Sequence, residues 1–149
     1  MISKIETDTK VRVRNWLKIL KTSNFIEKYL RERLRNDHHT TLPRFDVMSA
    51  LQRSPNGLKM SELSGVLKVS NGNITGIIDR VVDEGHVERM AIQGDRRAYL
   101  ASLTDKGSKK FQEYALEHEM WINELLSDIS LDDAKMITSL LSSISEKEI

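Results

Sequence analysis

The residues whose types and spacing could do chemistry lie in two short segments. Within residues 71–84, a stripe of branched apolar residues leaves a polar side that carries Asn71, Asn73, Thr75, Gly76, Asp79, Arg80 and Asp83. Residues 93–97 then place Arg96 and Arg97 beside a Gly and an Asp. Amides and hydroxyls can exchange hydrogen bonds with base edges, and guanidinium groups pair with phosphates. The chemistry indicated is recognition of a polar, anionic partner.

The sequence contains no recognisable arrangement of catalytic groups. There is no cysteine, no Gly-x-Ser-x-Gly motif and no glycine-rich phosphate loop. Asp and Glu total 22, but no spacing singles out a pair of carboxylates for acid–base work. We therefore expect a protein that is not an enzyme. The lack of cysteine also excludes disulfides, thiolate metal sites and a switch based on thiol oxidation.

The four histidines do not form a metal-binding motif. His38 and His39 lie at a helix junction, while His86 and His118 are far apart in the sequence. No pair has the spacing of a known set of metal ligands. We expect surface or capping histidines, with neither a metal nor another cofactor.

Length and composition are those of one compact globular domain. The chain has 149 residues, of which 39% are hydrophobic and 30% charged. No window approaches the eighteen or so apolar residues of a membrane span, and the N-terminal segment lacks the apolar stretch of a signal peptide. We expect a cytoplasmic protein without a membrane partner.

Charge is distributed unevenly along the chain. Residues 1–110 carry 21 Lys and Arg against 13 Asp and Glu, a balance of +8, whereas residues 111–149 carry 2 against 9, a balance of −7. Such a division permits a basic face for a polyanion and an acidic end away from it. The alternative is that these charges only solvate helix surfaces.

The apolar periodicity predicts mostly helices. A long amphipathic helix is expected over residues 9–36. Its length of about 40 Å exceeds what the core of so small a domain can cover, and a partner chain is therefore expected. Further helices are predicted over residues 43–53, around residues 63–67, over residues 71–84 with Ser70 as its N-cap, from Asp105 with Thr104 as its cap, and from Leu131 after Ser130. Residues 86–92 and 98–103 are expected to form a β-hairpin around residues 93–97.

The two helices before the hairpin are typical of a helix-turn-helix. They have about nine and fourteen residues and are joined by a tight turn, so the second could enter a major groove of DNA. The cationic hairpin tip is of a kind that can enter a minor groove.

The sequence resembles the MarR family of winged-helix transcription regulators over about residues 58–107. The residues that carry the resemblance are Glu62-Leu63-Ser64, Val69-Ser70 with Ile74-Thr75, Ile78-Asp79-Arg80-Val81-Val82, Glu84-Gly85, Val87-Glu88-Arg89, Asp95-Arg96-Arg97 and Leu103-Thr104-Asp105-Lys106-Gly107. The resemblance implies a mainly α fold with a small β-hairpin wing, in a single domain over residues 1–149. Residues 43–107 would form the winged helix-turn-helix lobe, and residues 9–40 and 111–149 would form interdigitating dimerisation helices.

The resemblance also implies which residues contact double-stranded DNA. The recognition helix would use Ser70, Asn71, Asn73, Thr75, Gly76 and Arg80, and the wing would use Gly94, Asp95, Arg96 and Arg97. Asn71 and Asn73 are the best candidates for direct readout because Asn can pair with adenine through two hydrogen bonds. Asp79 would pair with Arg97 and set its direction, while Asp95 would order the turn.

Two glycines depart from the family pattern. Gly72 and Gly76 lie inside the expected recognition helix, where each costs about 1 kcal/mol relative to Ala. They could permit a close approach of the helix backbone to DNA, or tertiary packing could simply tolerate them.

The expected function is that of a homodimeric regulator, a repressor, on a pseudo-palindromic operator. The resemblance implies that a small anionic aromatic effector relieves repression from a pocket between the dimerisation helices and the DNA-binding lobe. Candidate pocket residues are Trp16, Leu20, His39, Arg44, Phe45, Met48 and Phe111. The alternative is a winged-helix module that contacts a protein and does not bind DNA specifically.

Overall fold

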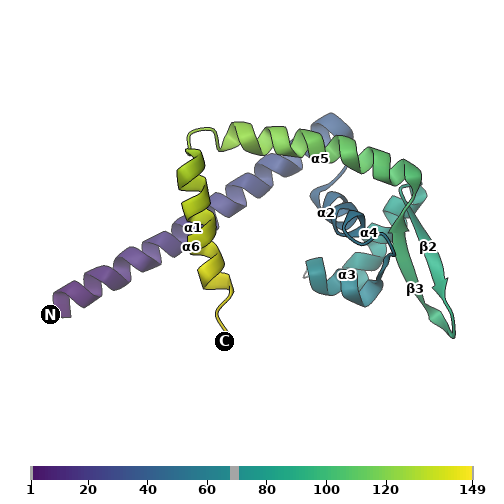
Figure 1. The fold of residues 1–149 in the computed structure, drawn as a ribbon, viewed down its shortest axis with the longest axis horizontal. Helices are drawn as coiled ribbons and strands as arrows, with labels where there is room; N and C mark the ends of the chain where they lie inside the picture. The colour runs from purple at the N-terminus through teal and green to yellow at the C-terminus, as the bar shows by residue number, and fades with distance from the viewer. Residues whose placement is uncertain (1, 68–70, 149) are drawn as a thin grey trace. The chain divides into compact units, whose positions relative to one another are not determined.

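The chain is mainly helical, with one small sheet. The computed structural model describes residues 2–67 and 71–148, and for residues 2–6, 71 and 96 it describes the backbone alone. The elements are α1 (Ile2–His38), α2 (Leu42–Gln52), β1 (Leu58–Lys59), α3 (Met60–Leu67), α4 (Asn71–Asp83), β2 (Val87–Ile92), β3 (Asp95–Leu103), α5 (Asp105–Leu125) and α6 (Leu131–Ser145) (Figure 1). They divide into two compact units, Met1–Glu113 and Tyr114–Ile149. In the described part of the chain, no helix is long and apolar enough to cross a membrane.

Helix α1 is longer than the sequence predicted. It has 37 residues, which corresponds to about 55 Å. It ends where His39 adopts a φ of +53°, and the amides of His39 and Thr40 donate to the carbonyls of Arg35 and Leu34 at 3.1 and 3.3 Å. A left-handed residue with these bonds is a common way to end a helix, here with His in place of the usual Gly.

The core of the first unit lies between α2, α3, α4 and the sheet. Helix α4 contributes Ile74, Ile78 and Val81, which are fully buried, so the predicted apolar stripe of this helix is confirmed. They pack with Val47, Ala50, Leu51, Leu63, Val87 and Ala101. Burial of this face fixes which side of α4 remains exposed.

The sheet has three antiparallel strands in the order β1-β3-β2. Strand β1 was not predicted, because two residues are too few to show an alternating pattern. The hairpin differs from the prediction at its tip: β3 begins at Asp95, so Arg97 lies in the strand and only residues 93 and 94 form the turn. Gly94 makes this shorter turn possible because it adopts a φ of +88°.

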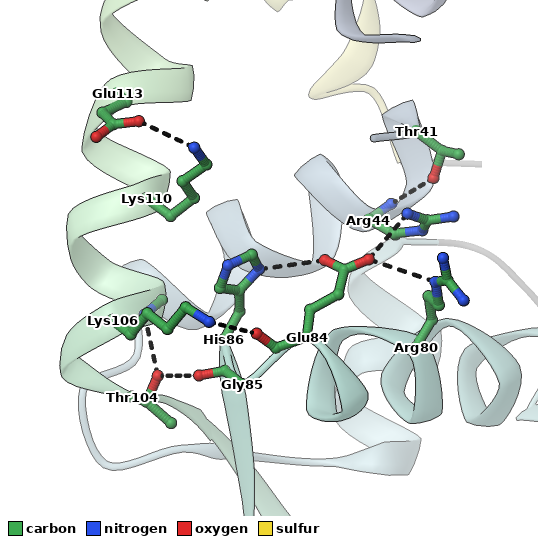
Figure 2. Close-up of polar contacts among 11 residues, drawn as sticks. Thr41, Arg44, Arg80, Glu84, Gly85, His86, Thr104, Lys106, Lys110 and Glu113 are labelled. Carbon is green, nitrogen blue, oxygen red and sulfur yellow. Dashed lines mark hydrogen bonds and ion pairs between the residues drawn. The ribbon is translucent and has the colours of Figure 1, made fainter. Parts of the chain in front are cut away.

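A hydroxyl joins the end of α4 to the start of α5. Thr104 Oγ1 donates to the carbonyl of Gly85 at 2.7 Å and accepts from the amide of Gly107 at 3.0 Å, which confirms the predicted cap (Figure 2). The amide of Thr104 also donates to the carbonyl of His86 at 3.0 Å. Lys106 Nζ donates to the carbonyl of Glu84 at 3.0 Å. These bonds fix both ends of the hairpin.

The Glu84 carboxylate connects three elements beside this joint. Its Oε1 accepts from Arg44 on α2 at 3.0 Å and lies 3.4 Å from Arg80 Nε on α4 (Figure 2). Its Oε2 lies 3.2 Å from Nδ1 of the buried His86. Burial lowers the pKa of His86. The positive charges of Lys106 and Lys110 lower it further, and the Glu84 carboxylate acts in the opposite direction.

The second unit contains α6, none of whose residues is buried. Ser130 caps this helix as predicted, because its Oγ accepts from the amide of Asp133 at 3.1 Å. Asp132 and Asp133 in the first turn suit the positive end of the helix dipole. The exposed apolar residues of α6 are Leu131, Met136, Ile137, Leu140, Leu141 and Ile144.

We expect Gly107→Ala to prevent stable folding of the winged-helix unit. A Cβ at this position would overlap the carbonyl oxygen of His86 and lie 2.7 Å from its carbon, and both are backbone atoms that α4, β2 and Thr104 hold in place. Overpacking against backbone should cost about 3 kcal/mol or more. Urea unfolding measures this cost. Gly65→Ala is the matched control, since its Cβ would meet nothing within 4 Å; equal effects of the two substitutions would contradict the assignment.

His86 should make stability fall in mild acid. Because its pKa is lowered on folding, the unfolded chain binds more protons near and below its ordinary value of about 6.5. The stability that the neutral His86 side chain contributes is therefore complete above about pH 6.5, and it is lost as the pH falls through the pKa that His86 has in the folded chain. Thermal unfolding between about pH 5 and 8 should show a steeper acid decline for the wild type than for His86→Gln. Parallel curves would exclude His86 as the cause.

Candidate nucleic-acid interface

The exposed side of α4 carries the polar residues singled out in the sequence. Asn73, Thr75, Gly76 and Arg80 are all exposed, because the opposite side of the helix is buried in the core. Ser70 lies outside the described residues, and Asn71 is described by its backbone only. Their predicted contacts with DNA stay predictions.

The hairpin β2–β3 forms the second part of the candidate interface. Figure 1 shows it projecting beyond the helices of the first unit, with the turn at its free end. The amide of Arg97 donates to Asp95 Oδ1 at 3.0 Å, so the bond of Asp95 lies at the start of β3 and not within the two-residue turn that it was expected to order. Arg97 is exposed, while Arg96 is described by its backbone only. A cationic residue is thereby presented close to the turn at Gly94.

The wing is connected to α4 through a residue that sequence reasoning did not single out. Asp79 was expected to pair with Arg97, but it pairs with Arg89 of β2. The guanidinium of Arg89 also lies 5.2 Å from the ring centre of Tyr99 on β3. Arg89 occurs in the family motif Val87-Glu88-Arg89, but its role depends on the strand pairing that places it beside α4. Its ion pair with Asp79 joins the hairpin to α4.

A cavity of about 670 Å³ lies beside the exposed face of α4. It is lined by residues from the end of α1, the start of α2 and α4, which are Arg31, Arg35, Thr40, Thr41, Leu42, Pro43, Arg44, Gly72, Asn73, Gly76, Ile77 and Arg80. Its volume is within the range of small-molecule sites. Arg44 is the one residue of the predicted effector pocket among these lining residues.

The other predicted pocket residues are not among the residues that line this cavity. Trp16 and Leu20 are exposed on α1, and His39 is exposed at its end. The remaining three are buried, and two of them pack against each other, Phe45 and Phe111, with ring centres 5.5 Å apart. Met48 is also buried. The role of these residues toward an effector stays a prediction.

Among residues 2–67 and 71–148, no group of three or more His, Asp or Glu side chains is placed to hold a metal ion. The groups of the candidate interface that the structure describes are Asn73, Thr75 and Arg80 on α4 and Arg97 on β3.

Comparisons with known proteins agree with this geometry. The model of the MarR family matches residues 40–99. A MarR family transcriptional regulator from Silicibacter pomeroyi is 33% identical in sequence, and the superposition covers 93% of this chain and 95% of that one with a TM-score of 0.77. A mutant MarR from Escherichia coli, solved with operator DNA, is 26% identical over 85% of this chain and 89% of that one, with a TM-score of 0.73.

A curated relative gives the same indication over a shorter range. The transcriptional regulator PecS from Dickeya dadantii is 30% identical over 99 residues, which are 65% of this chain and 60% of PecS. The chain thus spans less than two thirds of the length of that relative. Since the Silicibacter pomeroyi regulator matches this chain over almost its whole length at 33% identity, and the family model matches residues 40–99, the chain belongs to the MarR family.

Proposed function

We propose that the protein is a sequence-specific regulator of transcription that binds double-stranded DNA. The observation that carries the proposal is the exposed polar face of α4 next to an arginine-bearing wing, with Arg89 joining the two through Asp79. Helix α4 would enter the major groove, where amides read base edges, and the wing would lie over the minor groove. The Escherichia coli MarR solved with operator DNA supports this assignment by its similarity.

The functional form would be a homodimer. In the first unit, α1 leaves a row of apolar side chains exposed, which comprises Val13, Trp16, Leu17 and Leu20. In the second unit, α6 exposes a second row, which includes Ile137, Leu140 and Ile144. Exposed stripes of this kind mark association surfaces, and a second copy of the chain would cover them. A two-fold dimer would select a pseudo-palindromic operator with half-sites about 10 bp apart.

The regulator would act as a repressor that a small anionic effector releases. Arrangements of the two lobes that do not match consecutive major grooves would bind the operator weakly. An effector that favours them with a coupling of about 1–3 kcal/mol would change affinity about 5- to 150-fold. The arginine-lined cavity beside α4 supports an anionic rather than a neutral effector.

Fluorescence anisotropy with DNA from upstream of its own gene tests the function. We expect tight binding, selectivity over a scrambled duplex, and an affinity that falls steeply with salt because arginines displace counterions from phosphates. Titration at duplex concentrations well above Kd should saturate at two chains per operator. Binding that is equal for operator and scrambled DNA, at every salt concentration, would instead favour a protein-contact module or a distant target promoter, and genome-wide selection of bound DNA separates those two.

Two substitutions should separate base readout from backbone contact. Asn73→Ala should reduce discrimination at one operator position by about 1–3 kcal/mol. Arg97→Ala should weaken binding to all sequences and lower the salt slope by about one. Competition with single-base operator variants and salt titrations measure the two effects. Neither variant should unfold, since both side chains are exposed. If Asn73→Ala discriminates between bases as the wild type does at every position, Asn73 does not contact a base. If Arg97→Ala binds DNA with wild-type affinity, Arg97 does not belong to the interface.

A further inference from the structure

The start of the wing borders a second cavity, which shares no lining residue with the cavity beside α4. Its volume is about 210 Å³, and it is lined by Lys59, Met60, Ser61, Arg97, Ala98 and Tyr99. We call it the wing cavity. Small-molecule sites have volumes of about 300–1,000 Å³, so the wing cavity has room for a single chemical group rather than for a whole ligand.

The strand register explains why the wing cavity forms. Strand β1 is two residues long, and its second residue, Lys59, pairs with Leu100 of β3. Helix α3 begins at the next residue, Met60, so the chain leaves the sheet there. Residues 97–99 of β3 therefore extend past the end of β1, and the start of α3 faces them across the wing cavity.

Two cationic side chains line the wing cavity from different segments. Lys59 comes from β1 and Arg97 from β3, and both residues are exposed. Among residues 2–67 and 71–148, no described carboxylate lies within ion-pair distance of either side chain. Ser61 adds a hydroxyl to the lining. Ammonium, guanidinium and hydroxyl groups are donors that phosphate oxygens accept from.

Two carboxylates lie nearby, and each is bonded to the backbone. Glu62 Oε1 accepts from the amide of Lys59, and Asp95 Oδ1 accepts from the amide of Arg97, both at 3.0 Å. Neither Glu62 nor Asp95 lines the wing cavity. The two positive and two negative charges sum to zero, so an anion is attracted at short range, by direct contact with the cationic side chains, and not by the field of the region as a whole.

The wing cavity also lies next to the surface proposed to meet DNA, because Arg97 belongs both to its lining and to the set expected to contact DNA. In a helix-turn-helix, the first helix crosses the sugar–phosphate backbone while the second enters the major groove. With α4 in the major groove and the wing over the minor groove, the start of α3 and the start of β3 would face the backbone between the two grooves.

We propose that the wing cavity binds one phosphate of the DNA backbone, held by the Lys59 ammonium, the Arg97 guanidinium and the Ser61 hydroxyl. This phosphate site rests on the proposed DNA-binding function and deepens it. Lys59 and Ser61, which no sequence motif singled out, thereby join the DNA contacts. Because α3 and the wing share the phosphate, its binding fixes the position of the lobe along the duplex without reading a base.

Anisotropy and salt titration with the full chain test the site. Lys59→Gln should weaken binding about fivefold to tenfold at about 0.1 M salt, equally for operator and scrambled duplexes, and should lower the salt slope by about one. Lys59→Arg keeps the charge and should bind within about twofold of the wild type. Both variants keep the bond from the Lys59 amide to Glu62. The matched control is Lys109→Gln, an exposed lysine of α5 outside the wing cavity, which should leave the slope unchanged.

A set of operator duplexes, each with one neutral methylphosphonate in place of a phosphate, tests whether Lys59 and Arg97 hold the same phosphate. We expect one position in each half-site where the replacement weakens binding of the wild type about fivefold or more. At that position the loss should be smaller in Lys59→Gln and in Arg97→Ala, and absent when both substitutions are combined. Lys109→Gln should lose as much as the wild type.

Equal salt slopes and affinities for Lys59→Gln and Lys109→Gln would overturn the site. So would losses that are reduced at different positions in Lys59→Gln and Arg97→Ala, because the two side chains would then bind different phosphates. If the wild type binds operator and scrambled DNA equally, sequence-specific regulation is wrong, while the effect of Lys59→Gln on either duplex still decides the phosphate site. Absence of binding to any duplex overturns both.

Discussion

The arrangement of the winged helix depends on the bonds that Thr104 makes where the hairpin meets α5. Its hydroxyl bridges the Gly85 carbonyl and the Gly107 amide, and its own amide reaches the His86 carbonyl. One residue thus satisfies backbone groups from the end of α4, the start of β2 and the start of α5. Because Gly107 lies directly against the His86 carbonyl, no side chain can separate these segments. These contacts hold the base of the hairpin against the end of α4 and the start of α5.

Charged side chains add further contacts between the elements that the bonds of Thr104 connect. Glu84 holds Arg44 and Arg80 and lies beside the buried His86, so α2, α4 and the start of β2 share one carboxylate. At the other edge, Asp79 and Arg89 join α4 to the wing. These ion pairs are partly exposed, and exposed ion pairs contribute little stability. What these ion pairs do is hold α4, the residues that line the cavity and the hairpin β2–β3 in one relative orientation.

The same packing that buries one side of α4 determines what the other side can do. Branched residues at helical spacing occupy the core, so amides, hydroxyls, glycines and Arg80 are left facing outward. In the first unit, this face meets the arginine-rich end of α1 across the cavity. The surface proposed to read DNA and the arginine-lined cavity thus share residues of one helix.

The local sequence determined which helices and strands form, whereas the tertiary structure decided which distant residues contact one another. The stripe of Ile74, Ile78 and Val81, and the caps Thr104 and Ser130, could be predicted because periodicity and capping depend on residues within a few positions of each other. The pairing of Asp79 with Arg89, the two-residue strand β1 and the early start of β3 could not, since they depend on how α4 packs beside the hairpin and on strand register, which the local pattern does not show. The cavity could not be predicted either, because its arginines come from three helices, α1, α2 and α4, that only the fold brings together, with Gly72 and Gly76 also in its lining.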